Sequence, residues 1–219
     1  QPAAEQSVSL AKDPVAQALK SVFRVRVGEE WGTAVSTSIG LLTSSHLVQN
    51  VDFAELISSD GELMLAKVGR RDEIMDVALL EAPTSTPILE LPEVTRITLD
   101  QRVFILGTSL SDLSSNDAVR LSVSIRGMSR QPNGFQSIQL DGQPSSAQSG
   151  GPVIDADGKL LGLFAYSRRE PGEAHRAIAV ESLRDFGQST TSRTLVSRTP
   201  AIGNSTADTA AATPSLRPT

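Results

Sequence analysis

Short apolar segments alternate with turn-forming residues along most of this chain. Glycine, aspartate, asparagine and proline bound these segments, a pattern that predicts β-strands. The predicted strands span residues 22–27, 32–35, 40–43, 53–57, 63–68, 76–80, 103–106, 121–125, 135–140, 153–154, 160–164 and 177–180. Many short strands separated by turns are typical of an all-β barrel or sandwich.

A proline-rich stretch divides the strands into two groups. Pro83, Pro87 and Pro92 all lie within residues 83–99, and proline cannot donate the hydrogen bond that a central strand requires. We interpret the stretch as an extended connector. Two groups of strands joined in this way favour two barrels, the first at about residues 21–82 and the second at about residues 100–180.

Short helices are predicted at both ends of the strand-rich region. Asp13 is suited to cap the first helix, and Pro14 suits its first turn. A second helix is predicted at residues 181–186, so the folded domain is expected to span residues 13–186.

The two ends of the chain differ in composition from this domain. Residues 1–12 are expected to be a flexible N-terminus. Residues 187–219 are rich in serine, threonine, alanine and proline and contain no aromatic residue. Because so few apolar side chains cannot compensate for the entropy of ordering, we expect a disordered tail there.

The composition narrows the possible partners. Hydrophobic residues make up 39% of the 219 residues and charged residues 21%, as in ordinary soluble globular proteins. The net charge is −5, so nucleic acid is not an expected partner. No apolar run approaches the roughly 20 residues of a membrane-spanning helix. Cysteine is absent, which excludes disulfides and thiolate metal sites.

Three polar residues stand at the ends of apolar strands in an order that suggests catalysis. His46 follows one strand, Asp76 opens another, and Ser149 precedes two glycines and a proline. A serine hydroxyl becomes a strong nucleophile when an imidazole removes its proton, and a carboxylate orients that imidazole. The order histidine, aspartate, serine is the order found in chymotrypsin-like serine peptidases.

The motifs around these residues resemble the catalytic domain of the bacterial HtrA/Deg proteases. The similar segments are Gly32–Val35, Leu42–Val48, Asp76–Leu80, Phe104–Gly107, Ser149–Val153 and Asp157–Gly162. The resemblance implies two six-stranded antiparallel β-barrels, with His46 as general base, Asp76 as its orienting residue and Ser149 as nucleophile. It implies no metal and no organic cofactor. Family members normally add a PDZ domain, whereas only the predicted tail follows the catalytic domain in this sequence.

One residue departs from the family pattern beside the nucleophile. The resemblance implies an oxyanion hole formed by the backbone N–H groups of Ala147 and Ser149, but the family has glycine at position 147. If that N–H must point inward with positive φ, an alanine costs about 1–2 kcal/mol. We therefore expect that the hole can be collapsed at rest and form when substrate binds.

The resemblance also implies a substrate-binding pocket. Its expected residues are Gln143, Ala165, Tyr166 and His175. Gln143 carries no charge, which disfavours a strict preference for arginine or lysine. His175 is expected either to meet an acidic substrate side chain or to lie at a strand edge in solvent.

These observations predict a serine endopeptidase that acts on polypeptides through an acyl-enzyme. The alternative is a catalytically weak or inactive protease-like domain that binds peptides or a partner protein, because Ala147 impairs the oxyanion hole. The chain begins with Gln1, which is expected for an exported protein after removal of a leader, and equally for a shortened sequence. We therefore expect a periplasmic or secreted location. The oligomeric state is not predicted.

Overall fold

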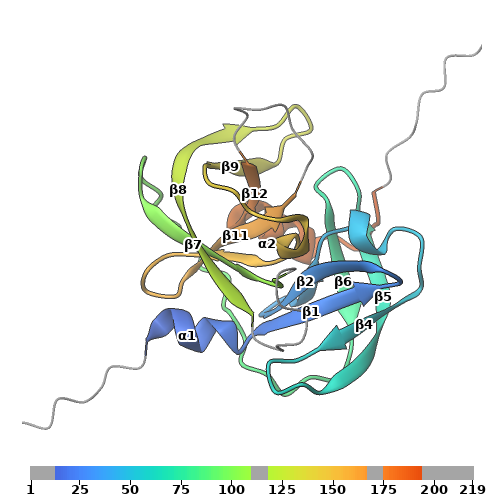
Figure 1. Ribbon diagram of the computed structural model, residues 1–219. Helices are drawn as coiled ribbons and strands as arrows, with labels where there is room; N and C mark the ends of the chain where they lie inside the picture. Colours follow the sequence, from blue (N-terminus) through green and yellow to red (C-terminus); the bar gives the residue numbers. More distant parts are fainter. Residues whose placement is uncertain (1–12, 110–117, 167–174, 194–219) are drawn as a thin grey trace, which may run out of the picture.

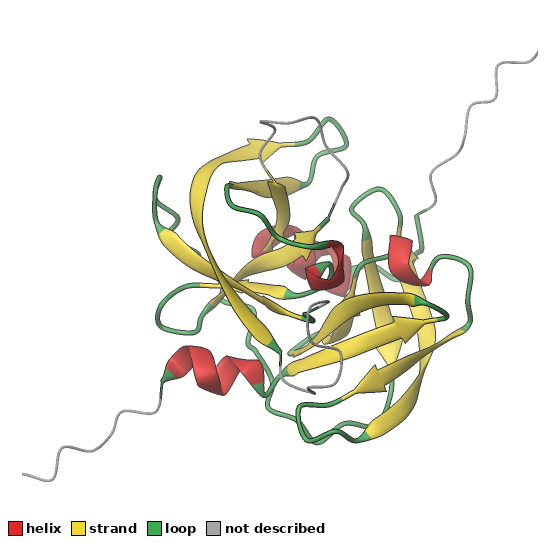
Figure 2. Ribbon diagram, viewed as in Figure 1, coloured by secondary structure: helices red, strands yellow, loops and turns green. Residues whose placement is uncertain are grey.

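The computed structural model describes residues 13–109, 118–166 and 175–193, and they form two closed six-stranded barrels (Figures 1 and 2). The first joins its strands in the order β1-β2-β3-β6-β5-β4, and the second in the order β10-β11-β12-β9-β8-β7. All neighbouring strands pair antiparallel. The predicted all-β class and the two barrels are confirmed.

All twelve predicted strands are present, and ten of them begin and end within two residues of the predicted bounds. The first barrel contains β1 (Val22–Val27), β2 (Glu30–Thr37), β3 (Gly40–Thr43), β4 (Phe53–Ile57), β5 (Leu63–Asp72) and β6 (Val77–Glu81). The second contains β7 (Arg102–Gly107), β8 (Val119–Arg130), β9 (Gln136–Leu140), β10 (Pro152–Ile154), β11 (Leu160–Ala165) and β12 (His175–Ala179).

The strands β5 and β8 are longer than the sequence predicts because each contains an irregularity in its pairing. The register shifts between Val68 and Arg71 in β5 and between Ile125 and Gly127 in β8. A bulge bends a strand without ending it, so the polar residues that follow remain in the sheet although the apolar alternation stops.

Each barrel has its own apolar core, and a third cluster joins them. Phe23 and Leu56 are fully buried in the first barrel, and Ile125 and Phe164 in the second. The joining cluster combines side chains of β2 and β3 with side chains of β11, β12 and α2 (Val180–Gln188), namely Val35, Leu42, Leu163, Ile178, Leu183 and Phe186. The two barrels therefore meet over a packed interface, which fixes the loops at its edge.

The short helix α1 (Pro14–Leu19) begins as predicted. The carboxylate of Asp13 accepts a hydrogen bond from the N–H of Val15 at 3.0 Å, which caps the helix. Val15 and Ala18 pack against β7, β10 and β11 of the second barrel. No helix in the described ranges is long and apolar enough to cross a membrane.

The start of the predicted tail needs a correction. The helix α2 continues to Gln188, past the predicted domain end at Phe186. Arg193 then pairs with Asp72 of β5, so residues just after 186 contact the first barrel. An ion pair holds them there, and apolar content does not reveal such a contact. The remainder of the predicted tail (194–219) and the predicted flexible N-terminus (1–12) lie outside the described residues.

Candidate active site

Strand pairing brings His46 and Asp76 to the same end of the first barrel. In the ladder between β3 and β6, Thr43 lies opposite Ala78. His46, three residues after Thr43, begins the short 3₁₀ helix η1 (His46–Val48), and Asp76 immediately precedes β6. Because the two strands are antiparallel, the end of β3 and the start of β6 are neighbours. The sequence separation of 30 residues is thereby closed.

Both carboxylate oxygens of Asp76 bind His46. Oδ2 lies 2.8 Å from the ring atom Nδ1, and Oδ1 accepts the backbone N–H of His46 at 2.8 Å. The side chains of His46 and Asp76 are 43% and 19% exposed, so the imidazole remains accessible to a substrate. The hydrogen bond that the imidazole donates to Asp76 raises the pKa of His46 above its ordinary value, and the charges of Asp76 and Glu30 add to this, while burial opposes it.

A strained turn presents Asp76 to the imidazole. Asp76 has φ 64°, a left-handed conformation that aspartate adopts more readily than most residues. The carboxylate of Asp72 supports the turn, because its Oδ1 accepts the N–H groups of Ile74 and Met75 at 3.1 and 3.0 Å. The turn between β5 and β6 is thus built around a buried aspartate that the sequence analysis did not identify.

Ser149 lies in a loop that requires glycine at the next position. Gly150 has φ +84°, and a Cβ there would lie 2.2 Å from the carbonyl oxygen of Thr33 and 2.8 Å from the N of Ser44. Its N–H donates to the carbonyl of Phe164 at 2.8 Å. Neither the conformation nor the space admits another residue, which explains the glycine after the serine.

The hydroxyl of Ser149 is buried and has two partners. Its Oγ lies 2.8 Å from Ser44 Oγ and accepts the backbone N–H of Tyr166 at 2.9 Å. Ser149 is only 1% exposed. Within the described part of the chain, no hydrogen bond joins Ser149 to His46. The structure brings the serine to the same region as His46 and Asp76 but directs its hydroxyl to Ser44.

The loop before the serine forms the 3₁₀ helix η2 (Ser146–Gln148). The N–H of Ser149, one of the two predicted oxyanion donors, bonds to the carbonyl of Ser146 at 3.0 Å. Ser145 and Gln148 form a capping box, in which the Ser145 N–H donates to Gln148 Oε1 at 2.9 Å. Ala147 is fully buried and is not in the left-handed region. In this conformation the alanine is unstrained and the Ser149 N–H is occupied.

Two threonines hold this loop against the first barrel. Thr33 Oγ1 donates to the carbonyl of Ala147 at 2.7 Å, and the Thr33 N–H donates to the carbonyl of Ser149 at 2.9 Å. The N–H of Thr108 donates to Thr33 Oγ1 at 2.9 Å. Neither threonine is predicted from the sequence to have this role, since a threonine in or beside a strand carries no signal of a partner in the other barrel.

The structure assembles part of the predicted substrate pocket. Ala165 is buried, and Tyr166 stacks on His175 with ring centroids 6.3 Å apart. His175 also faces Phe164 at 6.1 Å, so it packs between two rings rather than at a bare strand edge. Gln143 lies exposed in the loop before η2.

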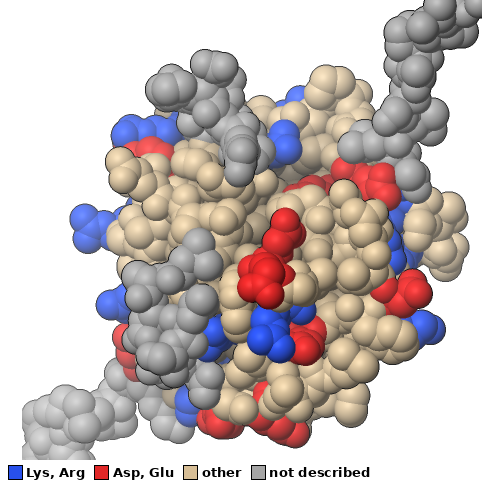
Figure 3. All heavy atoms as spheres, turned by 45° about the vertical axis from the view of Figure 1, so that its right-hand side comes forward, with Lys and Arg blue, Asp and Glu red and all other residues tan. Residues whose placement is uncertain are grey.

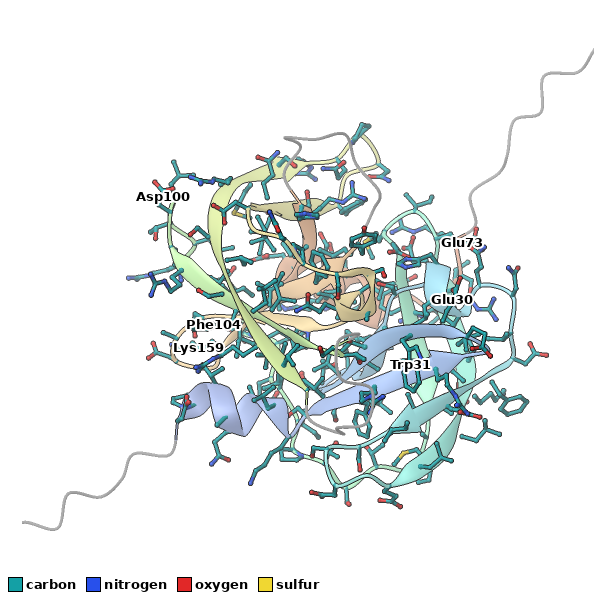
Figure 4. The ribbon with its side chains drawn as sticks, viewed as in Figure 1. Glu30, Trp31, Glu73, Asp100, Phe104 and Lys159 are labelled. Carbon is teal, nitrogen blue, oxygen red and sulfur yellow. The ribbon has the colours of Figure 1, made fainter. Side chains whose placement is uncertain are left out.

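Two depressions flank His46 and Tyr166, which line both. One has a volume of about 280 Å³ and is also lined by Ser45, Gln49, Glu73, Asp76, Ala165 and Arg176. The other has a volume of about 490 Å³ and is also lined by Glu29, Glu30, Trp31, Leu47 and Ser146. Glu30 and Trp31 project from β2 at its hairpin with β1 (Figure 4). An extended chain that crosses His46 therefore has room on both sides.

The described residues show neither a metal-binding cluster nor a further site marked by charge. In residues 13–109, 118–166 and 175–193, no group of three or more histidine, cysteine, aspartate or glutamate side chains is arranged to hold a metal ion. On the face drawn in Figure 3, basic and acidic side chains are interspersed among uncharged ones. The expectation that nucleic acid is not a partner stays a prediction.

Comparison with known proteins identifies the family. A family model described as the trypsin-like peptidase domain matches residues 32–163, more than half of the chain. The chain belongs to the trypsin-like peptidase family. The putative serine protease HhoB of Synechocystis sp. is 23% identical over 163 residues, which cover 72% of this chain and 39% of HhoB. The trypsin-like domain spans about a third of the length of such curated relatives.

Solved structures of HtrA-type proteases share the fold. The serine endoprotease from Yersinia pestis superposes with a TM-score of 0.68 and 20% identity, covering 79% of this chain and 63% of that one. The HtrA-type protease AlgW, solved with a decapeptide, gives a TM-score of 0.68 and 20% identity over 81% of this chain and 66% of that one. The predicted resemblance of this trypsin-like domain to HtrA-type proteases is confirmed.

Proposed function

We propose that the domain is a serine endopeptidase that hydrolyses peptide bonds through an acyl-enzyme, with His46 as general base, Asp76 as its orienting residue and Ser149 as nucleophile. The observation that carries the proposal is that Asp76 holds His46 by two hydrogen bonds. Its Oδ1 lies 2.8 Å from the backbone N of His46 and its Oδ2 lies 2.8 Å from Nδ1, beside the serine loop of a trypsin-like peptidase fold. The match to the trypsin-like peptidase family supports it.

The geometry of the pair suits proton transfer. Because Asp76 Oδ2 binds Nδ1, the proton of neutral His46 stays on that nitrogen and Nε2 is free to accept another. In the proposed reaction, Nε2 takes the proton of Ser149 as Oγ attacks the scissile carbonyl. The protonated imidazole then gives this proton to the leaving amine. In the second half of the reaction, water attacks the acyl-enzyme while Nε2 takes its proton, and the imidazole returns that proton to Ser149 Oγ.

The oxyanion donors must be released before this reaction can run. In the structure, the Ser149 N–H bonds to the Ser146 carbonyl. For two donors to lie about 2.7–3.1 Å from an oxyanion, η2 has to open and the N–H of Ala147 has to turn inward. We therefore propose that the described conformation is a resting state, and that substrate binding supplies the free energy of opening.

The proposed substrate is a polypeptide. The structure of AlgW with a decapeptide supports a peptide ligand for a domain of this fold. Ala165, Tyr166 and His175 are proposed to contact the acyl side of the substrate, together with Gln143. Since Gln143 carries no charge, we expect small or medium uncharged side chains there. A preference for acidic side chains that is lost in His175→Ala would replace this expectation. A periplasmic or secreted location stays a prediction.

Labelling with a fluorophosphonate probe tests the function. The purified protein should react at Ser149, and both His46→Ala and Ser149→Ala should lose nearly all labelling and proteolysis of an unfolded protein substrate. The double variant should be barely worse than either single one, because members of a triad act as a unit. Labelling that survives in Ser149→Ala would refute the assignment of the nucleophile. Absence of labelling in a folded wild-type protein would favour the peptide-binding alternative.

A further inference from the structure

A second buried serine contacts the proposed nucleophile. Ser44 Oγ lies 2.8 Å from Ser149 Oγ, across 105 residues of sequence. Ser44 is fully buried and Ser149 is 1% exposed, so water does not compete for this hydrogen bond. Ser44 follows β3 and belongs to the first barrel, whereas Ser149 belongs to the second.

The contact with Ser44 occupies either the hydrogen of the Ser149 hydroxyl or one of the lone pairs on its oxygen. A hydroxyl has one hydrogen to donate and two lone pairs that accept. The N–H of Tyr166 already donates to Ser149 Oγ at 2.9 Å. If Ser149 donates to Ser44, its only hydrogen is directed away from His46. If Ser44 donates instead, both lone pairs of Ser149 Oγ are occupied and the oxygen is a poorer nucleophile.

The partner that this arrangement displaces is the imidazole. His46 Nδ1 is bound to Asp76 at 2.8 Å, which leaves Nε2 as the nitrogen for Ser149. Among the described residues, Nε2 makes no hydrogen bond to Ser149. The Ser149 side chain must therefore exchange Ser44 for His46 before it can lose its proton.

We propose that Ser44 is a positioning residue that holds the Ser149 hydroxyl away from His46 in the resting state. The inference rests on the proposed function, since it requires Ser149 to be the nucleophile. It adds a residue outside the triad and gives the first barrel direct control of the nucleophile. Release from Ser44 is one of two changes that activation requires, the other being the opening of η2.

A buried serine outside the site provides a matched control. Ser21, immediately before β1, is also buried, at 1% exposed, and its Oγ has no hydrogen-bond partner within the described residues. Ser44→Ala and Ser21→Ala each remove one buried hydroxyl oxygen. Only the first change frees Ser149.

The test measures the second-order rate constant for labelling by a fluorophosphonate, in which Ser149 Oγ bonds to phosphorus, fluoride leaves and the proton passes to His46. A single hydrogen bond changes an equilibrium by about 2- to 10-fold, so Ser44→Ala should label about 2 to 10 times faster than wild type. Ser21→Ala should label at the wild-type rate. With a peptide substrate, kcat should rise while KM stays constant, and the midpoint of the acid limb should not move, because Asp76 and not Ser44 sets the pKa of His46.

Each outcome decides between defined possibilities. Equal or slower labelling of folded Ser44→Ala overturns the proposal while leaving the peptidase intact, because Ser44 would then be structural or would assist the reaction. Absence of labelling in both wild type and Ser44→Ala overturns the peptidase and the positioning role together. Labelling of Ser44→Ala alone supports both. Should thermal melting show that Ser44→Ala is unfolded, Ser44→Cys fills the site with a weaker hydrogen-bonding group and should show a smaller acceleration.

Discussion

The guanidinium of Arg193 binds the buried carboxylate of Asp72, with Nε 2.6 Å from Oδ2. The side chain of Asp72 is only 4% exposed, while that of Arg193 is 47% exposed. The other oxygen of Asp72 accepts the N–H groups that shape the turn before Asp76. The segment after α2 thus supports the turn that carries the proposed orienting residue.

Removal of this arginine should lower the stability of the domain. Arg193→Ala leaves a buried carboxylate without its cation, which costs about 1–3 kcal/mol and should lower the Tm by roughly 3–10 °C for a domain of this size. Arg126→Ala is the control. Arg126 pairs with Asp100 and Asp141, but its side chain is 53% exposed, so this loss should cost at most about 1 kcal/mol. Equal melting temperatures of wild type and Arg193→Ala would show that Asp72 does not need its partner.

The pH profile should report the charge beside His46. The proposed role of His46 as general base requires a neutral imidazole, and the pKa of His46 is raised in the structure from the ordinary 6.5. The acid limb of kcat/KM should therefore have its midpoint above 6.5. Glu30→Gln removes one of the charges that raise this pKa, so the midpoint should move to lower pH.

Glu29→Gln is the matched control for this shift. Glu29 lines the same depression beside His46 but is not among the causes that raise its pKa. The glutamine at position 29 should leave the midpoint in place. Identical shifts in the two variants would mean that the general acidity of the hairpin, and not Glu30, acts on His46. An upward shift in Glu30→Gln would contradict the electrostatic argument itself.

Ala147→Gly should raise turnover if opening of η2 limits the enzyme. Glycine removes the cost of about 1–2 kcal/mol that alanine pays in the left-handed region, which corresponds to a gain of roughly 5- to 30-fold in kcat with an unfolded protein substrate. Ala147→Pro deletes the N–H donor and should abolish activity, since one donor contributes about 10²–10³ in turnover. Unchanged activity in the glycine variant would show that the alanine does not limit turnover. Full activity in the proline variant would exclude this N–H from the oxyanion hole.

Gly150→Ala should prevent the serine loop from forming. The added methyl would lie 2.2 Å from a backbone oxygen, so we expect a loss of roughly 4 kcal/mol or more in the free energy of unfolding. Gly134→Ala is the comparison, because Gly134 has φ +95° but open space around the added atom, and should cost only about 1–2 kcal/mol. Urea denaturation of both variants measures the difference. Similar losses would show that backbone conformation alone, without the clash, requires glycine.

The sequence predicted the elements that depend on local pattern. The strands follow from apolar segments between turns, and His46, Asp76 and Ser149 follow from motifs that end or open those strands. The contacts that set the state of the site are not local. The partner of Ser149 lies 105 residues away and that of Arg193 lies 121 residues away. The local sequence around a serine that follows a strand, or around an arginine in a polar tail, does not reveal whether such a distant partner exists.

The bonds from Thr33 to Ala147 and Ser149 bear on the order of events during synthesis. Thr33 leaves the ribosome 114 residues before Ala147, and domains synthesised first generally fold first. A nascent chain that has completed only the first barrel has His46 and Asp76 but lacks Ser149, the proposed nucleophile. Even after the second barrel forms, its serine loop reaches the proposed resting conformation only once Thr33 is docked on it. The proposed triad can therefore be assembled only after both barrels have folded and docked, so a partly synthesised chain has no complete triad.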